Sequence, residues 1–247
     1  MLTVRGLRKD YPGPVTAVRN LDLDVGAGEI VGLLGPNGAG KTTTMRMLTT
    51  LLRPTSGTAT IAGVDLVTDP AGVRRRIGTV GQGGSTDPTF TIREELELQG
   101  RLHGLSAATA RARADELIER FDLGSSDGGD RPTGRLSGGQ RRRLDVALGL
   151  VHRPTVLFLD EPSTGLDPRS RATLWDSVRA VRDEGTTVVL TTHYLAEADA
   201  CCDRVVVIDA GRVVADGTPA ALKSEAGANS TLDDVFLALT NRTEELA

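Results

Sequence analysis

Residues 35–43 read Gly35-Pro36-Asn37-Gly38-Ala39-Gly40-Lys41-Thr42-Thr43, after the apolar run Ile30–Leu34 and before a helix-compatible stretch, Thr44–Leu52. This strand–loop–helix order is the context that a phosphate-binding loop requires. The glycines let backbone N–H groups turn toward phosphate oxygens, and a helix start adds partial positive charge. Lys41 is expected to reach the outer phosphates, and the Thr42 hydroxyl to bind Mg²⁺. The loop therefore predicts that the chain binds a nucleoside triphosphate.

A pair of carboxylates ends a second strand-like segment. Val156–Leu159 is continuously apolar, as in a strand buried on both faces, and Asp160 and Glu161 follow it. Ligands of parallel sheets bind at the carboxyl ends of the strands, the end that also carries the glycine-rich loop. We therefore expect Asp160 to hold magnesium, directly or through water, and Glu161 to polarise the attacking water. The alternative is an ordinary strand end with solvated acids, which the loop at 35–43 disfavours.

A third motif reads Leu136-Ser137-Gly138-Gly139-Gln140 and is followed by Arg141–Arg143. Its glycines expose backbone amides at a helix start and Ser137 adds a donor, which predicts a second anion site. One triphosphate does not need two such helix ends from the same chain. A nucleotide held by a partner subunit would explain the second site. A simple Gly-Gly turn before a helix explains the same residues equally well.

The order of the predicted elements indicates an α/β chain with a mostly parallel, helix-covered sheet. A helical block interrupts the alternation, because Thr91–Glu94 is a capping box for a helix to about Leu102 and Ser106 caps a second helix. A polar loop is expected at 124–132. The expected strands are Leu2–Leu7, Leu21–Val25, Thr58–Ile61, Ile77–Val80, Thr186–Leu190, Val205–Asp209 and Arg212–Ala215; the other expected helices are one ended by Arg53-Pro54, Gln140–Val151, one from Asp167-Pro168 to Gly185, and Thr231–Leu239.

Composition bounds the class of protein. The 39% hydrophobic and 25% charged residues are typical of a soluble globular chain, and the net charge of −4 argues against a nucleic-acid partner. No apolar run approaches the roughly 20 residues that cross a bilayer, and no charged-then-apolar leader follows Met1, so we expect a cytoplasmic location. Cys201 and Cys202 are adjacent, which disfavours a disulfide and indicates small, partly buried residues at a helix end.

Residues 2–220 resemble the ATP-binding cassette (ABC) ATPases of membrane transporters. The motif at 136–140 matches that family's signature without a change, and 35–42 and 156–161 match its phosphate loop and carboxylate pair. The resemblance implies a P-loop NTPase fold with a RecA-like core at about 1–84 and 140–220, and N-terminal antiparallel strands. It also implies an inserted helical subdomain at about 85–139 and a C-terminal tail at 221–247. The implied ligands are ATP, on residues 35–43 and Ser137–Gln140, and Mg²⁺, on Thr42, Gln82 and Asp160.

Four further positions match looser features of that family. Gln82, among Gly81, Gly83 and Gly84, resembles the glutamine that contacts magnesium and reports to the membrane subunit. Ser163–Asp167 resembles the loop that crosses the dimer interface. His193 follows a strand at the place of the family's switch histidine, and Tyr11 is placed like the aromatic that stacks on adenine.

Three of these four positions also have a structural alternative. Gln82 is then plain loop, His193 a packing residue, and Tyr11 an anchor for the loop at Pro12-Gly13. His103 and His152 have no such setting and are expected to be solvated. Arg141–Arg143 is either an anion patch or, as we favour, a solvated helix face.

The resemblance also implies a mechanism. Two copies of the chain pair head to tail around a two-fold axis, with each ATP between the loop of one copy and Ser137–Gly139 of the other. Lys41, Mg²⁺ and backbone amides stabilise the phosphate charge, Glu161 orients water and His193 steadies the terminal phosphate. Gln82 and the helical block pass dimer closure to separate transmembrane permease subunits.

Thr191–Ala198 and Thr231–Leu237 resemble the subgroup that energises bacterial drug-resistance exporters, so we expect an ATPase at the cytoplasmic face of the membrane. One alternative is a soluble mechanochemical cassette acting on ribosomes or DNA, although such relatives generally carry two cassettes or a long coiled-coil insertion. Another is an ATP-sensing module without turnover, which Glu161 and His193 disfavour. A co-purifying membrane protein and a phosphate-release assay separate these hypotheses.

Overall fold

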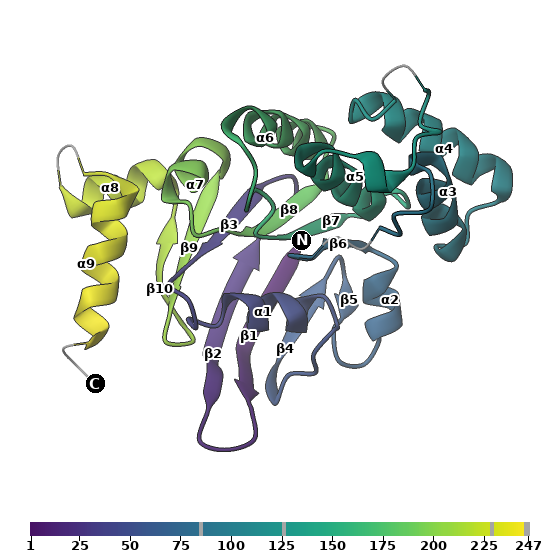
Figure 1. Ribbon diagram of the computed structural model, residues 1–247. Helices are drawn as coiled ribbons and strands as arrows, with labels where there is room; N and C mark the ends of the chain where they lie inside the picture. The colour runs from purple at the N-terminus through teal and green to yellow at the C-terminus, as the bar shows by residue number, and fades with distance from the viewer. Residues whose placement is uncertain (84–85, 125–126, 228–229, 245–247) are drawn as a thin grey trace.

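The structure is a computed structural model that describes residues 1–83, 86–124, 127–227 and 230–244. Figure 1 shows two sheets, with helices α5 and α6 packed over one of them and α1 beside the other. Helices α3 and α4 form one end of the molecule, and α8 and α9 form the opposite end. The long alternation of strands and helices predicted an α/β fold, and this prediction is confirmed.

The larger sheet has six strands in the order β10-β9-β3-β8-β7-β6. All neighbours pair in parallel except β9 and β10, which form the predicted hairpin. Because β3, β8 and β7 are adjacent, their carboxyl ends meet at one edge of the sheet, where a ligand is expected. The strands are β3 (Ile30–Leu34), β6 (Ile77–Val80), β7 (Val156–Asp160), β8 (Thr187–Thr191), β9 (Arg204–Asp209) and β10 (Arg212–Gly217).

The smaller sheet is antiparallel, in the order β2-β1-β4-β5, which confirms the expected N-terminal antiparallel strands. Helix α1 (Lys41–Leu48) shares one hydrophobic core with both sheets, through side chains such as Met47 and Leu48. This packing fixes the start of α1 against the carboxyl end of β3. The strands are β1 (Leu2–Asp10), β2 (Thr16–Val25), β4 (Ser56–Ile61) and β5 (Val64–Asp65).

Helix α1 is shorter than predicted, and the expectation that Arg53-Pro54 ends it was wrong. It ends at Leu48, because Thr50 adopts a left-handed backbone with φ 64°. The N–H groups of Leu51 and Leu52 then both donate to the Arg46 carbonyl at 2.9 Å. Positive φ is uncommon for a β-branched residue, so the sequence carries no signal for this early end.

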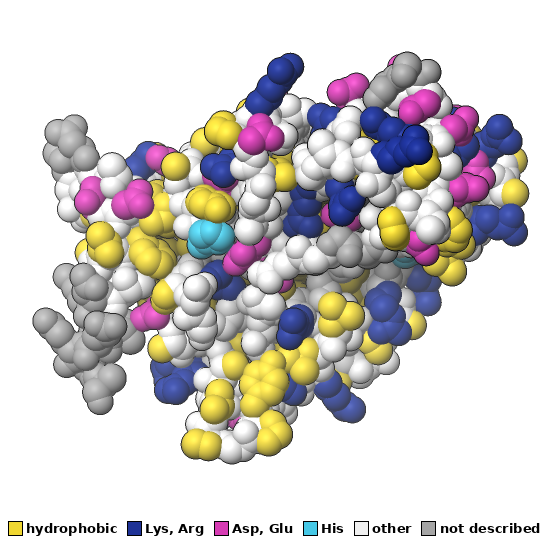
Figure 2. Space-filling view, in the orientation of Figure 1, with side chains coloured by type: hydrophobic (Ala, Val, Ile, Leu, Met, Phe, Trp, Pro, Cys, Tyr) yellow, Lys and Arg dark blue, Asp and Glu magenta, His cyan; other side chains and the backbone are white. Residues whose placement is uncertain are grey.

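The helical block consists of α3 (Ile92–Leu102) and α4 (Ala107–Arg120). The predicted capping box of α3 and the Ser106 cap of α4 are both confirmed. On the face drawn in Figure 2, Lys and Arg side chains over this end of the molecule are interspersed with Asp and Glu. The predicted loop at 124–132 includes residues 125 and 126, and the predicted start of the block falls at 84–85; these four residues lie outside the described ranges.

Helices α5 (Gly138–Leu150), α6 (Pro168–Asp183) and α7 (Leu195–Cys201) follow the helical block. The Asp167 cap of α6 is confirmed, whereas α5 begins two residues before the predicted Gln140 because Ser137 caps it. Cys201 and Cys202 are buried free thiols at the end of α7, as expected, and burial raises the pKa of Cys201. Short helices α2 (Pro70–Arg74) and α8 (Pro219–Ala226) were not predicted.

The C-terminal segment packs against the rest of the chain. The predicted helix at 231–239 is confirmed and is longer, as α9 (Leu232–Glu244). Leu222 of α8 and Leu232 and Val235 of α9 belong to the same hydrophobic core as the strands of the larger sheet. Among the described residues, no helix combines the length and apolar character needed to span a bilayer.

Candidate functional site

The glycine-rich loop connects β3 to α1 and is held closely on two sides. A Cβ atom on Gly35 would lie 2.1 Å from the Ile208 carbonyl oxygen, and one on Gly40 would lie 2.5 Å from the Ala17 carbonyl oxygen. Gly40 also has φ 105°, which a residue with a side chain rarely adopts. Gly38 has open space at its Cβ position. The sequence therefore builds a tight loop whose exposed face is left open, as a phosphate cradle requires.

Lys41 begins α1 and folds back over this loop. Its buried Nζ donates to the Gly35 carbonyl at 2.6 Å and to the Pro36 carbonyl at 3.0 Å. Burial lowers the pKa of Lys41, while the carboxylates of Glu161 and Asp160 oppose that shift. The ammonium group thus lies inside the loop, in the electrostatic field of both acids. It can exchange two neutral carbonyls for phosphate oxygens, which are stronger partners.

The carboxylate pair lies at the end of β7, as predicted. Thr191, at the end of neighbouring β8, donates from Oγ1 to Asp160 Oδ1 at 2.5 Å. The same Oγ1 accepts from the Glu161 N–H at 3.0 Å, so one hydroxyl links both acids to β8. Glu161 has φ 47°, a strained backbone for this residue type, of the kind that clusters at functional sites.

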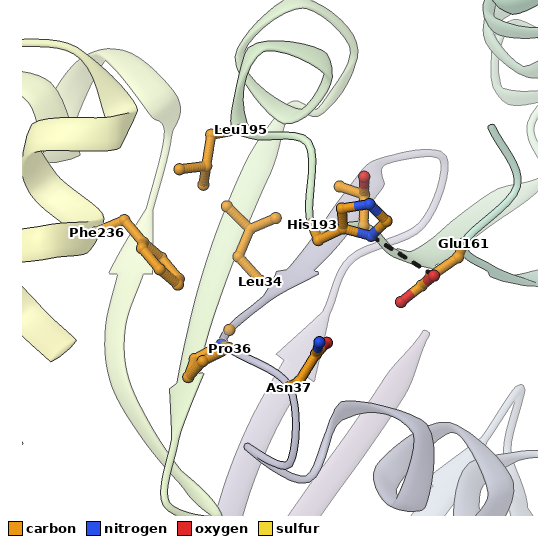
Figure 3. A pocket seen from close by; sticks show the side chains of 9 residues that line it. Leu34, Pro36, Asn37, Glu161, His193, Leu195 and Phe236 are labelled. Atoms are coloured by element: carbon orange, nitrogen blue, oxygen red, sulfur yellow. Dashed lines mark ion pairs between the residues drawn. The ribbon is translucent and has the colours of Figure 1, made fainter. Parts of the chain in front are cut away.

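A cavity of about 350 Å³ brings together the loop and the ends of β7 and β8. Figure 3 shows Asn37, Glu161 and His193 around it, with an ion pair drawn between the last two. His193 Nδ1 lies 3.5 Å from Glu161 Oε2. Thr164 Oγ1 donates to the same oxygen at 3.3 Å. The cavity is lined by Leu34, Gly35, Pro36, Asn37, Glu161, Thr192, His193, Leu195 and Phe236.

A second cavity, of about 390 Å³, brings Gln82 together with Asp160. Met45 and Arg46 of α1, the helix that also carries Thr42 and Thr43, form another wall of it. Carboxylate, amide and hydroxyl oxygens are the ligands that Mg²⁺ prefers. The donor set predicted for magnesium is therefore chemically suitable, and its members Gln82 and Asp160 face one space.

The Ser-Gly-Gly turn lies away from both cavities. Ser137 caps α5: its Oγ accepts from the Gln140 N–H at 3.2 Å, and Gln140 Oε1 accepts from the Ser137 N–H at 3.1 Å. Ser137, Gly139 and Gln140 line a separate cavity of about 530 Å³ with Arg143 and residues of α6. A single copy of the chain therefore does not bring this turn to the glycine-rich loop.

Tyr11 also lies apart from the cavity that holds Glu161. It follows β1 and is half-buried, its N–H donates to the Val15 carbonyl at 2.9 Å, and Lys9 Nζ lies 5.7 Å from its ring centre. The role in adenine stacking remains a prediction.

The expectation of a solvated face at 141–143 was wrong for Arg142. Its side chain is buried and donates to backbone carbonyls beside the site, from Nε to Pro162 at 2.7 Å and from a terminal nitrogen to Gly81 at 2.7 Å. The spacing held no signal for this, because the residues four and seven positions after each of the three arginines are all buried. Only Arg141 is exposed as expected.

Sequence reasoning also missed Glu197, a buried carboxylate of α7. Its Oε2 accepts from Ser163 Oγ at 2.5 Å and from Thr192 Oγ1 at 3.5 Å, and its Oε1 pairs with Arg171 Nε at 3.0 Å. Glu197 thereby joins the loop at 163–167 to the segment that carries His193. The available sequence signal for Glu197 was an acidic residue in the first turn of a helix, four residues after His193.

The two other histidines are not both solvated, which corrects the prediction for His152. The His103 and His152 rings stack with centroids 3.7 Å apart and an interplanar angle of 1°. Burial, His103 and Arg113 lower the pKa of His152 to about 4, while a hydrogen bond to the Ile77 carbonyl opposes the shift. His103, which ends α3, is an exposed residue overall, but the partial desolvation of its ring lowers its pKa as well.

Comparison with known proteins places the chain in a family. The model of the family described as ABC transporter matches residues 18–164. The daunorubicin resistance ATP-binding protein DrrA3 of Streptomyces coeruleorubidus is 55% identical over 226 residues, which are 92% of this chain and 71% of that protein.

Solved structures share the fold. A structure of the ATP-binding subunit of an ABC transporter superposes with a TM-score of 0.85 at 28% identity, covering 97% of this chain and 99% of the other. The dimeric structure of an ATP-binding cassette in a post-hydrolysis state, bound to ADP and Pi, superposes with a TM-score of 0.79 at 26% identity, covering 88% and 98%.

Proposed function

The chain belongs to the ABC transporter family, and we propose that it is the ATP-hydrolysing subunit that energises a membrane exporter through ATP-driven closure of a dimer. As a member of that family it is an ATPase with a P-loop NTPase fold. The relative named for daunorubicin resistance supports export of a drug or other hydrophobic cargo. The observation that carries the proposal is the single cavity that holds the glycine-rich loop, Glu161 and His193.

The residues of this cavity have complementary roles in phosphoryl transfer to water. Lys41 and the amides of Gly38–Thr43 bind the phosphates and oppose the charge that spreads over them in the transition state. Glu161 accepts a hydrogen bond from the attacking water and orients it. His193, 3.5 Å from the Glu161 carboxylate, donates to the terminal phosphate and limits the freedom of the acid.

Magnesium fits the residues of the neighbouring cavity. Asp160, Gln82 and the Thr42 hydroxyl would hold the ion, directly or through water. When bound, Mg²⁺ neutralises part of the charge on the phosphates. The chain's own contribution is to fix Asp160, through the hydroxyl of Thr191 on the next strand.

A second copy of the chain completes the proposed site. The Ser-Gly-Gly turn lies on a separate cavity, so it is free to meet the nucleotide of another copy. The dimeric cassette bound to ADP and Pi supports this pairing. In the resulting head-to-tail dimer each nucleotide lies between the loop of one chain and Ser137–Gln140 of the other, with Tyr11 stacked on the adenine.

Separate transmembrane permease subunits would receive the movement that dimer closure produces. We divide the chain into a core, an inserted helical subdomain at about 85–139 and a tail at 221–247. When the dimer closes, the helical subdomain moves relative to the core. Gln82 follows β6, in the segment that leads from the core to the helical subdomain. Peripheral attachment to the cytoplasmic face of the membrane follows from this assembly.

The test has two arms. Phosphate release by the purified chain is measured with ATP and Mg²⁺, with EDTA in place of Mg²⁺, and with Glu161→Gln as the matched inactive variant. We expect release that requires both Mg²⁺ and Glu161. The second arm expresses the tagged chain in its own cells and identifies the membrane protein that co-purifies. A soluble ribosomal or DNA partner in place of a permease would overturn the exporter assignment.

A further inference from the structure

Arg142 lies on α5, two residues after the Ser-Gly-Gly-Gln turn, and its side chain is 8% exposed. A guanidinium group buried to this extent requires hydrogen-bond partners on most of its donors. Its partners here are backbone carbonyl oxygens at the end of β7 and in the segments that follow β6 and β7. Nε donates to Pro162 at 2.7 Å, and the terminal nitrogens donate to Gly81 at 2.7 Å, Asp160 at 3.1 Å and Glu161 at 3.3 Å.

These contacts leave the reactive groups untouched. Arg142 binds the carbonyls of Asp160 and Glu161, so their carboxylates remain available to magnesium and to water. Its planar fork fixes the directions of several bonds at once, which a lysine ammonium on a flexible stem does not do. The guanidinium therefore sets the relative positions of three backbone segments: the loop at Gly81, the end of β7 and the start of the loop at Pro162.

Glu161 needs such a constraint. Its φ of 47° is unfavourable for a residue with a side chain, and it persists only where the surroundings over-determine it. Thr191 accepts from the Glu161 N–H, and Arg142 donates to the Glu161 carbonyl, so the backbone of the strained residue is held on both sides of its Cα atom.

Burial of this cation is not needed for packing alone. Burial lowers the pKa of Arg142, opposed by the carboxylates of Asp145 and Asp160. Asp145 lies one helical turn away, with its Oδ2 3.7 Å from Arg142. An apolar side chain of similar length would fill the same space without this desolvation, so the hydrogen bonds are the feature that an arginine supplies.

We propose that Arg142 is a positioning residue that holds Glu161 in its working conformation and couples it to the Ser-Gly-Gly turn of the same chain. When the nucleotide of a partner copy binds that turn, α5 moves as a rigid helix, and Arg142 carries the movement to Glu161 and to the Gly81–Gln82 segment. Each chain's own hydrolysis thereby depends on whether its turn is occupied. This inference rests on the proposed function.

The test compares Arg142→Lys with Arg141→Lys, the same change at the exposed neighbour. Turnover is measured per bound nucleotide, with the bound fraction determined by ATP titration, so that unfolded protein does not count. We expect Arg142→Lys to lower kcat on the order of 10- to 100-fold, because a displacement of about 1 Å at a catalytic group has effects of that size. ATP affinity should change by less than about twofold, because Lys41 lies on another element. Arg141→Lys should match the wild type.

A second measurement separates positioning from general destabilisation. If Arg142 acts through Glu161, adding Arg142→Lys to Glu161→Gln lowers the remaining turnover no further, whereas an unrelated structural defect multiplies with it. Equal kcat for Arg142→Lys and wild type, or a multiplicative double variant, would overturn the positioning role alone. Absence of Mg²⁺-dependent phosphate release in the wild type would overturn the proposed function, and the positioning role with it.

Discussion

Ser163 Oγ donates a 2.5 Å hydrogen bond to Glu197 Oε2, and both side chains are buried. The first belongs to the loop predicted to cross the dimer interface, and the second to the helix that begins just after His193. Thr192, the neighbour of His193, contacts the same carboxylate oxygen. A displacement of the loop at 163–167 therefore has a short, buried route to the histidine that lines the proposed nucleotide cavity.

Glu197→Ala removes this link and leaves the Arg171 guanidinium without its ion-pair partner. We expect the free energy of unfolding to fall by about 2–4 kcal/mol, because a buried charged network loses its acceptor. Chemical denaturation measures the change. Asp199→Ala on the same helix is the control, because its pair with Lys223 is at the surface and should contribute less than about 1 kcal/mol. Equal effects of the two substitutions would contradict the idea that Glu197 joins the loop at 163–167 to the segment that carries His193.

Glu161→Gln keeps the shape of the side chain but removes its negative charge. We expect a loss of turnover of about 10²–10⁴-fold, because the water loses its orienting base. ATP binding should remain, and the ATP-bound dimer should persist, since hydrolysis no longer opens it. Sedimentation velocity with ATP checks the dimer, and phosphate release checks turnover. Near-normal turnover would remove Glu161 from its role.

Lys41→Ala tests the phosphate loop. The ammonium group is buried against two carbonyls of the loop that is expected to hold the phosphates. Hydrogen bonds to a charged group contribute about 1.5–3 kcal/mol. Their loss should therefore raise the Kd for ATP roughly 10- to 100-fold. Titration of a fluorescent ATP analogue measures this increase. An unchanged Kd would count against the loop as the triphosphate site.

Ser137→Arg tests the contribution of a second copy. The turn does not line the cavity that holds Gly35 and Glu161, so binding of ATP to one chain should be unaffected. The long charged side chain should prevent another nucleotide from approaching the turn, and the chain should sediment as a monomer with ATP. Glu161→Gln provides the background in which a dimer persists. A dimer of the double variant equal to that of Glu161→Gln alone would exclude pairing through Ser137.

The stacked histidines predict a loss of stability in acid. The folded pKa of His152, about 4, lies below its ordinary value of 6.5, so the unfolded chain binds more protons between these two pH values. Stability therefore rises with pH across that window and is lost as pH falls. We expect His152→Phe to reduce the loss between pH 7 and pH 5 by about 1–2 kcal/mol, discounted for screening by water. Urea unfolding at both pH values measures the difference. Parallel pH slopes for the two proteins would refute the assignment.

Much of the site follows from local patterns in the chain. The glycine-rich loop and the Asp160–Glu161 pair each follow an apolar strand, and parallel strands bring their carboxyl ends together without further information. The turn at Ser137 also carries its own capping signal.

The remaining features depend on contacts between segments that are distant in sequence. In the sequence, Arg142 is indistinguishable from two neighbouring arginines. Its burial depends on four backbone carbonyls that segments distant in sequence supply. His152 is half-buried, with the His103 ring at the end of α3 stacked on it and the Ile77 carbonyl in contact with Nε2. The left-handed Thr50, which ends α1, has no signature in composition or spacing. These are tertiary effects, and periodicity within one element does not encode them.

Phe236 of the C-terminal helix α9 lines the same cavity as Gly35 and His193 (Figure 3). A shortened chain that stops before residue 231 is therefore not a neutral reagent for enzymology: it removes an aromatic side chain from the wall of the proposed nucleotide pocket while leaving the glycine-rich loop, the carboxylate pair and the Ser-Gly-Gly turn in place. Rates obtained with such a truncated protein would describe an incomplete pocket, and inhibitor screens run on it would select compounds for a crevice that the chain with α9 in place does not possess.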